Sequence, residues 1–209
     1  MALIAHGGKS RSTVPDSNLR TPALRMFPFA GDLARTGRRG GLAVAQLRYR
    51  VVGYNDGDPV RDVEWAIDEL SERFDVPVCL VGHSMGARAA LRAAGHERVT
   101  AVAGLAAWCP PDEPVEQLAG RTVLLVHGTR DRVTDPARSL EFGRRARETA
   151  ARLARFEIAR AGHTMLQRLP LWQSLTRRFV LGALGLEPMD ERLAAAFALP
   201  SERALRVPL

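Results

Sequence analysis

One segment near the middle of the chain restricts the fold more than any other. An apolar run from Val76 to Val81 leads directly into Gly82-His83-Ser84-Met85-Gly86, and a helical pattern follows from Ala87. A strand that becomes a helix over so short a distance needs a very tight bend, which holds the central serine in a strained backbone conformation. Side chains at the two flanking positions would collide with the neighbouring strand and helix, so glycine is needed there. The segment predicts a strand, a sharp turn and a helix in succession.

The same alternation of short apolar runs and longer helical periods extends along the chain. It indicates an α/β fold, with a reduced, mostly parallel sheet of about six strands and helices on both faces. The predicted strands are Ala2–Ala5, Leu42–Leu47, Val76–Val81, Thr100–Ala106, Thr122–Val126 and Arg155–Ala159. Helices are expected to fill the intervals between them.

Two of these helices have recognisable starts. Asp58-Pro59 and Asp135-Pro136 each place an aspartate where it can cap free amides and a proline at the first helical position. After Pro59, apolar residues recur at intervals of three and four, which predicts a helix with one face on the sheet. The second helix should run to about Ala151, and a third should follow His163.

The composition is that of a soluble globular protein. Apolar residues make up 46% of the 209 residues and charged residues 25%. We predict a single domain over residues 1–209, in which prolines leave 187–209 as a C-terminal extension of undefined structure. The N-terminus lacks the pattern of a secretory signal, and no apolar run reaches membrane-spanning length. We therefore expect a cytoplasmic protein with no membrane partner.

The basic residues raise the question of an acidic partner, because the net charge is +7. Lys9 is the only lysine, and the arginines are spread along the whole chain instead of forming one cluster. The run Arg-Arg-Ala-Arg at 144–147 lies in a predicted helix interleaved with glutamate, which is typical of a solvated face. We therefore expect no nucleic-acid partner.

The predicted turn has chemical consequences for Ser84. It would lift the serine Oγ above the end of the sheet, where the following helix presents free amides and the positive end of its dipole. The amide of Met85, directly after the serine, would then face an oxyanion developing on a bound carbonyl group. The alternative is a glycine-bounded turn in which the serine has no role. The order of strand, Gly-x-Ser-x-Gly and helix favours a nucleophilic serine.

With two later segments, this turn resembles the α/β-hydrolase superfamily, and the resemblance extends from Leu3 to about Leu186. In that family an acid and then a histidine follow the nucleophile, each after one of the last strands. The matching positions are Asp131 and His163, and the intervals between the three residues each leave room for one strand and one helix. The resemblance implies that Ser84 is the nucleophile, His163 the general base and Asp131 the acid that orients it.

Five histidines compete for the role of base, and only His163 has the expected context. His6 and His127 each precede a glycine at a strand end, where a structural hydrogen bond to a loop is usual. The side chain of His83 should point away from the serine beside it. His96 lies in a polar turn and should be exposed. For His163 itself, the alternative is a residue at a capped helix start.

The acid also has rivals. Asp135 is close to Asp131 in sequence, but a helix cap already explains it. Asp112 and Glu113 are alternatives of another kind, because some members of the family take their acid from the loop after the preceding strand. The sequence leaves that exchange open.

The second oxyanion amide is expected from the loop after the first strand, His6-Gly7-Gly8-Lys9, which resembles the His-Gly loop of the family. Gly8 is the preferred donor and Lys9 the reserve. The interval from Trp108 to Thr122 is too short for a lid, so we expect an open site without a cap domain. Lys9, Trp108 and Met165 are the expected pocket walls, although Trp108 fits the core equally well.

These features predict a serine hydrolase that cleaves a small acyl ester through an acyl-enzyme, with no metal or organic cofactor. A thioesterase acting on acyl-CoA or acyl-carrier thioesters is the enzymatic alternative, and a non-catalytic binding protein is the alternative from another class. Lys9, Arg11, Arg48 and Arg50 could meet a phosphate or carboxylate on the substrate, although ordinary surface charge also explains them. We expect the two leading antiparallel strands common in the family to be absent, which would leave a sheet edge unprotected. We expect a monomer or a homodimer.

Overall fold

The strands of the chain lie in one parallel sheet. The computed structural model describes residues 1–209, apart from the side chain of Ser201. The strands are β1 (Ala2–Ala5), β2 (Val44–Gln46), β3 (Val78–His83), β4 (Val99–Leu105), β5 (Thr122–Gly128), β6 (Arg152–Ile158) and β7 (Val207–Pro208). They follow the order β2-β1-β3-β4-β5-β6-β7, and every neighbouring pair is parallel. All the predicted strands are present, with ends that differ by a few residues.

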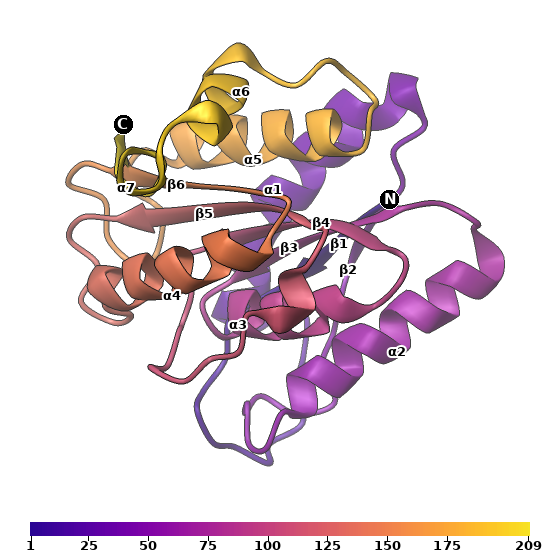
Figure 1. Cartoon of the computed structure of the whole chain (residues 1–209). Helices are drawn as coiled ribbons and strands as arrows, with labels where there is room; N and C mark the ends of the chain where they lie inside the picture. Colours follow the sequence, from indigo (N-terminus) through magenta and orange to yellow (C-terminus); the bar gives the residue numbers. More distant parts are fainter.

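Helices cover both faces of the sheet (Figure 1). They are α1 (Thr21–Gly37), α2 (Asp58–Arg73), α3 (Met85–Arg92), α4 (Pro136–Thr149), α5 (Leu169–Ala183), α6 (Glu191–Ala198) and α7 (Ser201–Ala204). In this view α1, α5 and α6 lie above the sheet, and α2, α3 and α4 lie below it. Within the described chain no cap domain covers the sheet, so the predicted parallel sheet with helices on both faces and no cap is confirmed.

Alternate residues of each strand face opposite hydrophobic clusters, because side chains of a strand point to its two faces in turn. In β1, Leu3 and Ala5 belong to the cluster between the sheet and helices α2, α3 and α4. Ala2 and Ile4 belong to the cluster between the sheet and helices α1, α5 and α6. Both faces are therefore apolar. This is why the strands appear in the sequence as continuous hydrophobic runs.

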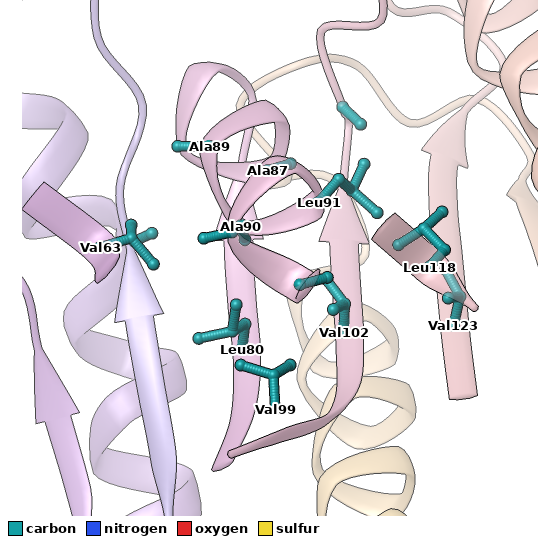
Figure 2. Packing of buried hydrophobic residues seen from close by; sticks show 14 of the residues in the cluster. Val63, Leu80, Ala87, Ala89, Ala90, Leu91, Val99, Val102, Leu118 and Val123 are labelled. Carbon is teal, nitrogen blue, oxygen red and sulfur yellow. The ribbon is translucent and has the colours of Figure 1, made fainter. Parts of the chain in front are cut away.

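Helix α3 packs closely on the centre of the sheet. Figure 2 shows Ala90 of this helix above Leu80 of β3, with Leu91 beside Val102 of β4. All four side chains are at most 1% exposed. Small residues on α3 allow the helix to approach the sheet, and the approach fixes the position of the turn that precedes the helix.

The C-terminal extension adds an element that the sequence pattern did not show. Its last residues form β7, so the sheet has seven strands instead of about six. Val207 pairs with Phe156 and Pro208 with Glu157. The buried guanidinium of Arg155 donates to the carbonyl oxygen of Leu205 at 3.0 Å, which anchors the segment before β7. A two-residue strand containing proline is confined to a sheet edge and leaves no alternating pattern to detect.

The two predicted helix caps differ in outcome. Asp135 accepts a hydrogen bond from the amide of Ala137 at 2.8 Å and caps α4, as predicted. The prediction for Asp58 is wrong by one residue, because Gly57, with a φ of 91°, occupies the capping position of α2. The carboxylate of Asp58 accepts instead from the side chains of Asn55 and Arg61, at 2.8 Å and 2.6 Å.

Candidate active site

Ser84 lies at the turn between β3 and α3 in a conformation that side-chain-bearing residues rarely adopt. Its φ is 56° and its ψ is −118°. A Cβ atom on Gly82 would lie 2.4 Å from the carbonyl oxygen of Gly86, in α3. One on Gly86 would lie 2.3 Å from the carbonyl oxygen of Ala5, in β1. The predicted collisions with helix and strand are therefore confirmed.

We expect Gly86→Ala to lower the free energy of unfolding by about 3 kcal/mol or more, because the added methyl group meets fixed backbone atoms. Gly31→Ala is the matched control, since a Cβ atom there meets nothing within 4 Å. Gly31 lies inside α1, so alanine should stabilise the protein by about 0.5–1 kcal/mol. Urea denaturation measures both changes. A Gly86→Ala variant as stable as the original protein would contradict this geometry.

The turn from Gly82 to Gly86, which we call the elbow, lies beside the amides expected to form an oxyanion hole. The amide of Met85 opens α3 and has no acceptor among the described residues, as is usual in the first turn of a helix. Gly8 lies against this residue, because a Cβ atom on it would be 2.5 Å from the sulfur of Met85. Its amide also lacks a described acceptor. Lys9, the reserve donor, does not fit the role, because its amide donates to the carbonyl oxygen of Val52 at 3.0 Å.

Asp131 and His163 come together from the loops that follow β5 and β6. Nδ1 of His163 lies 2.8 Å from Oδ2 of Asp131, and the carboxylate is buried while the imidazole is 11% exposed. A neutral imidazole that donates from Nδ1 carries its free lone pair on Nε2. The pair can therefore accept a proton at Nε2 and hold the resulting positive charge beside a carboxylate.

The surroundings of Asp131 keep it ionised. The amides of Val133 and Thr134 donate to Oδ1 at 2.8 Å and 3.0 Å, and the Thr134 hydroxyl donates to Oδ2 at 2.9 Å. Nε2 of His127 lies 3.2 Å from the same Oδ2. Burial alone would raise the pKa of Asp131, but hydrogen bonds from His127, His163, Thr134 and Val133 hold the pKa well below its ordinary value. For Thr134 no role was predicted, and for His127 only a hydrogen bond to a loop.

His83 links the elbow to the loop that carries His163. Its Nε2 donates to the carbonyl oxygen of His163 at 2.9 Å, and the two ring centroids are 4.8 Å apart. Burial, and then the neighbouring His163, lowers the pKa of His83 to about 3, so the ring is neutral at pH 7. The sequence predicted only that this side chain points away from the serine, and its contact with the loop of His163 was not predicted. Its position directly before the nucleophile was the only signal.

The buried neutral ring of His83 has a consequence for stability. The unfolded chain protonates this residue near pH 6.5, but the folded protein does so only near pH 3. The unfolded state therefore binds more protons between these values, so the stability present above pH 6.5 is lost as the pH falls. We expect His83→Gln, which can still donate to the carbonyl oxygen, to reduce this loss by about 1 kcal/mol per pH unit. Urea denaturation between pH 7 and pH 5 measures it, and equal pH slopes for the two proteins would contradict it.

Ser84 and His163 are not bonded to each other in this structure. Within the part of the chain that is described, neither Ser84 Oγ nor His163 Nε2 forms a hydrogen bond. Such contacts are often long in unliganded enzymes and shorten when substrate binds. The structure thus places Asp131 against His163. His83, the residue directly before Ser84, bonds the loop of His163 to the turn that carries the serine.

The rival acids lie elsewhere. Asp112 is exposed, and Asp135 caps a helix. Glu113 is buried, but its two carboxylate oxygens face Nε of Arg88 at 2.6 Å and Nε of Arg92 at 2.9 Å. Among the acids considered, Asp131 alone contacts His163 in the described chain. The geometry therefore favours Asp131.

The three residues expected to line the pocket differ in burial and in contacts. Met165 is fully buried and packs in the core with α1 and α5, so it lines no open pocket. The side chain of Lys9 is exposed. Trp108 is partly buried and lies against both the core and the guanidinium of Arg88. Its amide donates to the carbonyl oxygen of Ser84 at 3.2 Å, which places it directly beside the elbow.

The comparison with known families agrees with this geometry. A family model described as the alpha/beta hydrolase family matches residues 3–208. The chain belongs to that family. The resemblance inferred from the sequence is therefore confirmed. Among curated protein sequences, none matches this chain.

Solved structures of the alpha/beta hydrolase type share the fold at low identity. An alpha/beta hydrolase of unknown function from Agrobacterium tumefaciens has a TM-score of 0.67 at 13% identity, covering 91% of this chain and 88% of its own. A Pyrococcus furiosus esterase has a TM-score of 0.63 at 14% identity, covering 86% and 79%. A Paleococcus ferrophilus monoacylglycerol lipase has a TM-score of 0.59 at 16% identity, covering 89% and 94%. These likenesses show the fold.

The described residues of this family member contain neither a candidate membrane span nor a candidate metal cluster. No described helix is both long enough and apolar enough to cross a membrane. The described histidine, cysteine, aspartate and glutamate side chains form no group of three that could hold a metal ion.

Proposed function

We propose that this protein is a serine hydrolase that cleaves carboxylic esters, with Ser84, His163 and Asp131 as its catalytic triad. Ser84 Oγ attacks the ester carbonyl while its proton moves to Nε2 of His163. Asp131 keeps the imidazole in the tautomer that can accept this proton and stabilises the imidazolium that forms. The carbonyl oxygen, now an oxyanion, accepts from the amides of Met85 and Gly8.

In the later steps His163 acts first as an acid and then again as a base. The tetrahedral intermediate collapses, the bond to the alcohol oxygen breaks, and His163 returns its proton to the departing alcohol. Water then attacks the acyl group on Ser84, with His163 again as base. A carboxylic acid leaves, and the serine hydroxyl is restored. The neutral Ser84 and the ionised Asp131 are the protonation states that this cycle needs at its start.

One observation supports the proposal above the others. The serine is held in a strained turn at a helix N-terminus, and an aspartate kept ionised by its surroundings lies 2.8 Å from the histidine of the next loop. The structural relatives include an esterase and a lipase, which agrees with ester chemistry. The absence of a cap over the described chain favours small, accessible esters over long buried chains.

A fluorophosphonate probe and a small substrate panel test the proposal. We expect the folded protein to form one adduct, at Ser84, and to hydrolyse short 4-nitrophenyl esters faster than acyl-CoA thioesters. Faster turnover of the thioesters would make the protein a thioesterase. No adduct and no turnover in folded protein would contradict catalysis and favour a binding protein on the hydrolase fold.

A further inference from the structure

Arg88 lies one helical turn beyond the nucleophile and is held in a defined position. Its amide donates to the carbonyl oxygen of Ser84 at 3.2 Å. The carbon of its guanidinium group lies 3.9 Å from the ring centroid of Tyr54 and 4.5 Å from that of Trp108. These two rings meet edge to face at 5.5 Å. Aromatic residues from two separate segments therefore pack against one cation.

The charge on Arg88 is only partly balanced. Nε donates to Oε2 of Glu113, and the other oxygen of Glu113 faces Nε of Arg92. Two guanidinium groups thus share one buried carboxylate. Nη1 and Nη2 of Arg88 have no acceptor among the described residues, although a guanidinium group is built to hold an anion by two parallel hydrogen bonds.

The residue that carries these free donors lines a cavity. Arg88 and Tyr54 line a hollow of about 550 Å³ that also touches Asn55, Val60 and Arg92. Its rim carries the exposed side chains of Asp56, Arg61 and Glu64. The side chain of Arg88 is 14% exposed, whereas those of Arg92 and Arg61 are 39% and 57% exposed. The rim therefore has solvated charges of both signs, and Arg88 is the most deeply buried of the three cations.

We infer that this cavity is an anion subsite of the active site, in which Nη1 and Nη2 of Arg88 bind a carboxylate or phosphate group of the ester substrate. This inference rests on the proposed function and names the class of substrate. Charge-assisted hydrogen bonds are strongest where water is partly excluded, as between the rings of Tyr54 and Trp108.

The cations expected from the sequence do not form this site. Arg50 pairs with the carboxylate of Asp62, and Arg48 and Arg50 line another hollow, beside the exposed Trp65, which shares only Arg61 with this cavity. The cation whose backbone is bonded to Ser84 and whose side chain lines the cavity comes instead from α3. Its spacing of four residues from Ser84 is the signal that the sequence contained.

Two esters with the same acyl chain length test the subsite. In 4-nitrophenyl hemiglutarate the chain ends in a carboxylate, and in 4-nitrophenyl valerate it ends in a methyl group. We expect kcat/KM of the original protein to be about tenfold or more higher for the anionic ester. Arg88→Met should reduce this ratio to about one or less, and Arg88→Lys should keep part of it as a point charge.

Arg138→Gln is the matched control, because Arg138 lies on α4 and its described partner is Glu141. It should leave the ratio unchanged. An original protein without preference for the anionic ester, or an Arg88→Met variant that keeps the preference, would overturn the inference. If Arg88→Met does not fold, the ratio of the original protein and that of Arg88→Lys still decide.

Calorimetry separates the failure of this inference from that of the proposed function. Glutarate and inorganic phosphate are titrated into the original protein and into Arg88→Lys. Binding of glutarate alone assigns a carboxylate, and binding of phosphate alone assigns a phosphate. Either should weaken in the variant, even in a protein that hydrolyses no ester. Binding of neither anion would overturn the subsite, whatever the ester panel shows.

Discussion

Ser84→Ala is expected to reduce kcat for a 4-nitrophenyl ester by about 10⁴-fold or more, while the protein remains folded. The Oγ atom of Ser84 forms the bond of the acyl-enzyme, and alanine has no atom that can replace it. The methyl group of alanine fits the same space, although the positive φ of 56° at this position stays strained. Hydrolysis rates and fluorophosphonate labelling measure the change. Ser174→Ala, at a partly exposed serine of α5, is the control and should have no effect.

The double variant gives a sharper test of the same mechanism. If Ser84 and His163 act as one unit, Ser84→Ala combined with His163→Ala should be no slower than either single variant. Multiplied losses would mean that the two residues contribute independently. That result would fit a histidine that only binds substrate, and it would contradict proton transfer between Nε2 and the serine.

The turn at Ser84 could be predicted from the sequence because its strand, its Gly-x-Ser-x-Gly segment and its helix follow one another directly in the chain. Gly82 and Gly86 are required by atoms within a few ångströms, and the tight turn leaves the serine little conformational choice. The strands were recognisable because each is buried on both faces. The positions of Asp131 and His163 were implied by the resemblance to the α/β-hydrolase superfamily. The parallel pairing of β5 and β6 explains why the loops after these strands meet at one edge of the sheet.

Contacts between distant segments could not be predicted in this way. His83 contacts the carbonyl oxygen of His163 although the two residues are 80 positions apart in the sequence. The cluster around Arg88 joins segments whose spacing in sequence has no common period. The seventh strand depends on a buried arginine that anchors the chain end. In each case the deciding term is tertiary packing, which hydrophobic periodicity does not record.

The misplaced residues have equally specific reasons. Met165 follows the catalytic histidine of the proposed triad closely, but with a φ of 61° its backbone turns and its side chain enters the core. Lys9 lies in the expected loop, but its amide pairs with Val52 and aligns the loop with the segment after β2. A residue's proximity in sequence to a site therefore did not determine which way it faces.

Asp131→Asn is expected to lower kcat by about 10³- to 10⁴-fold with little change in overall structure. The amide of asparagine can place an N–H where Oδ2 now accepts from Nδ1 of His163 at 2.8 Å. The imidazole would then have to accept at Nδ1 and carry its proton on Nε2, where it could no longer take the proton of Ser84. The loss should therefore appear mainly in kcat, and KM should change little. Steady-state kinetics with one ester separates the two.

Asp112→Asn is the matched control, since this carboxylate is exposed and lies in the loop after β4 that supplies the acid in some relatives. It should retain full activity. The opposite pattern, with Asp112→Asn inactive and Asp131→Asn active, would show that substrate binding rearranges the loops and that the contact seen here is structural. Because hydrogen bonds hold the pKa of Asp131 well below its ordinary value, activity of the original protein should show no acidic limb from this carboxylate between pH 5 and pH 7.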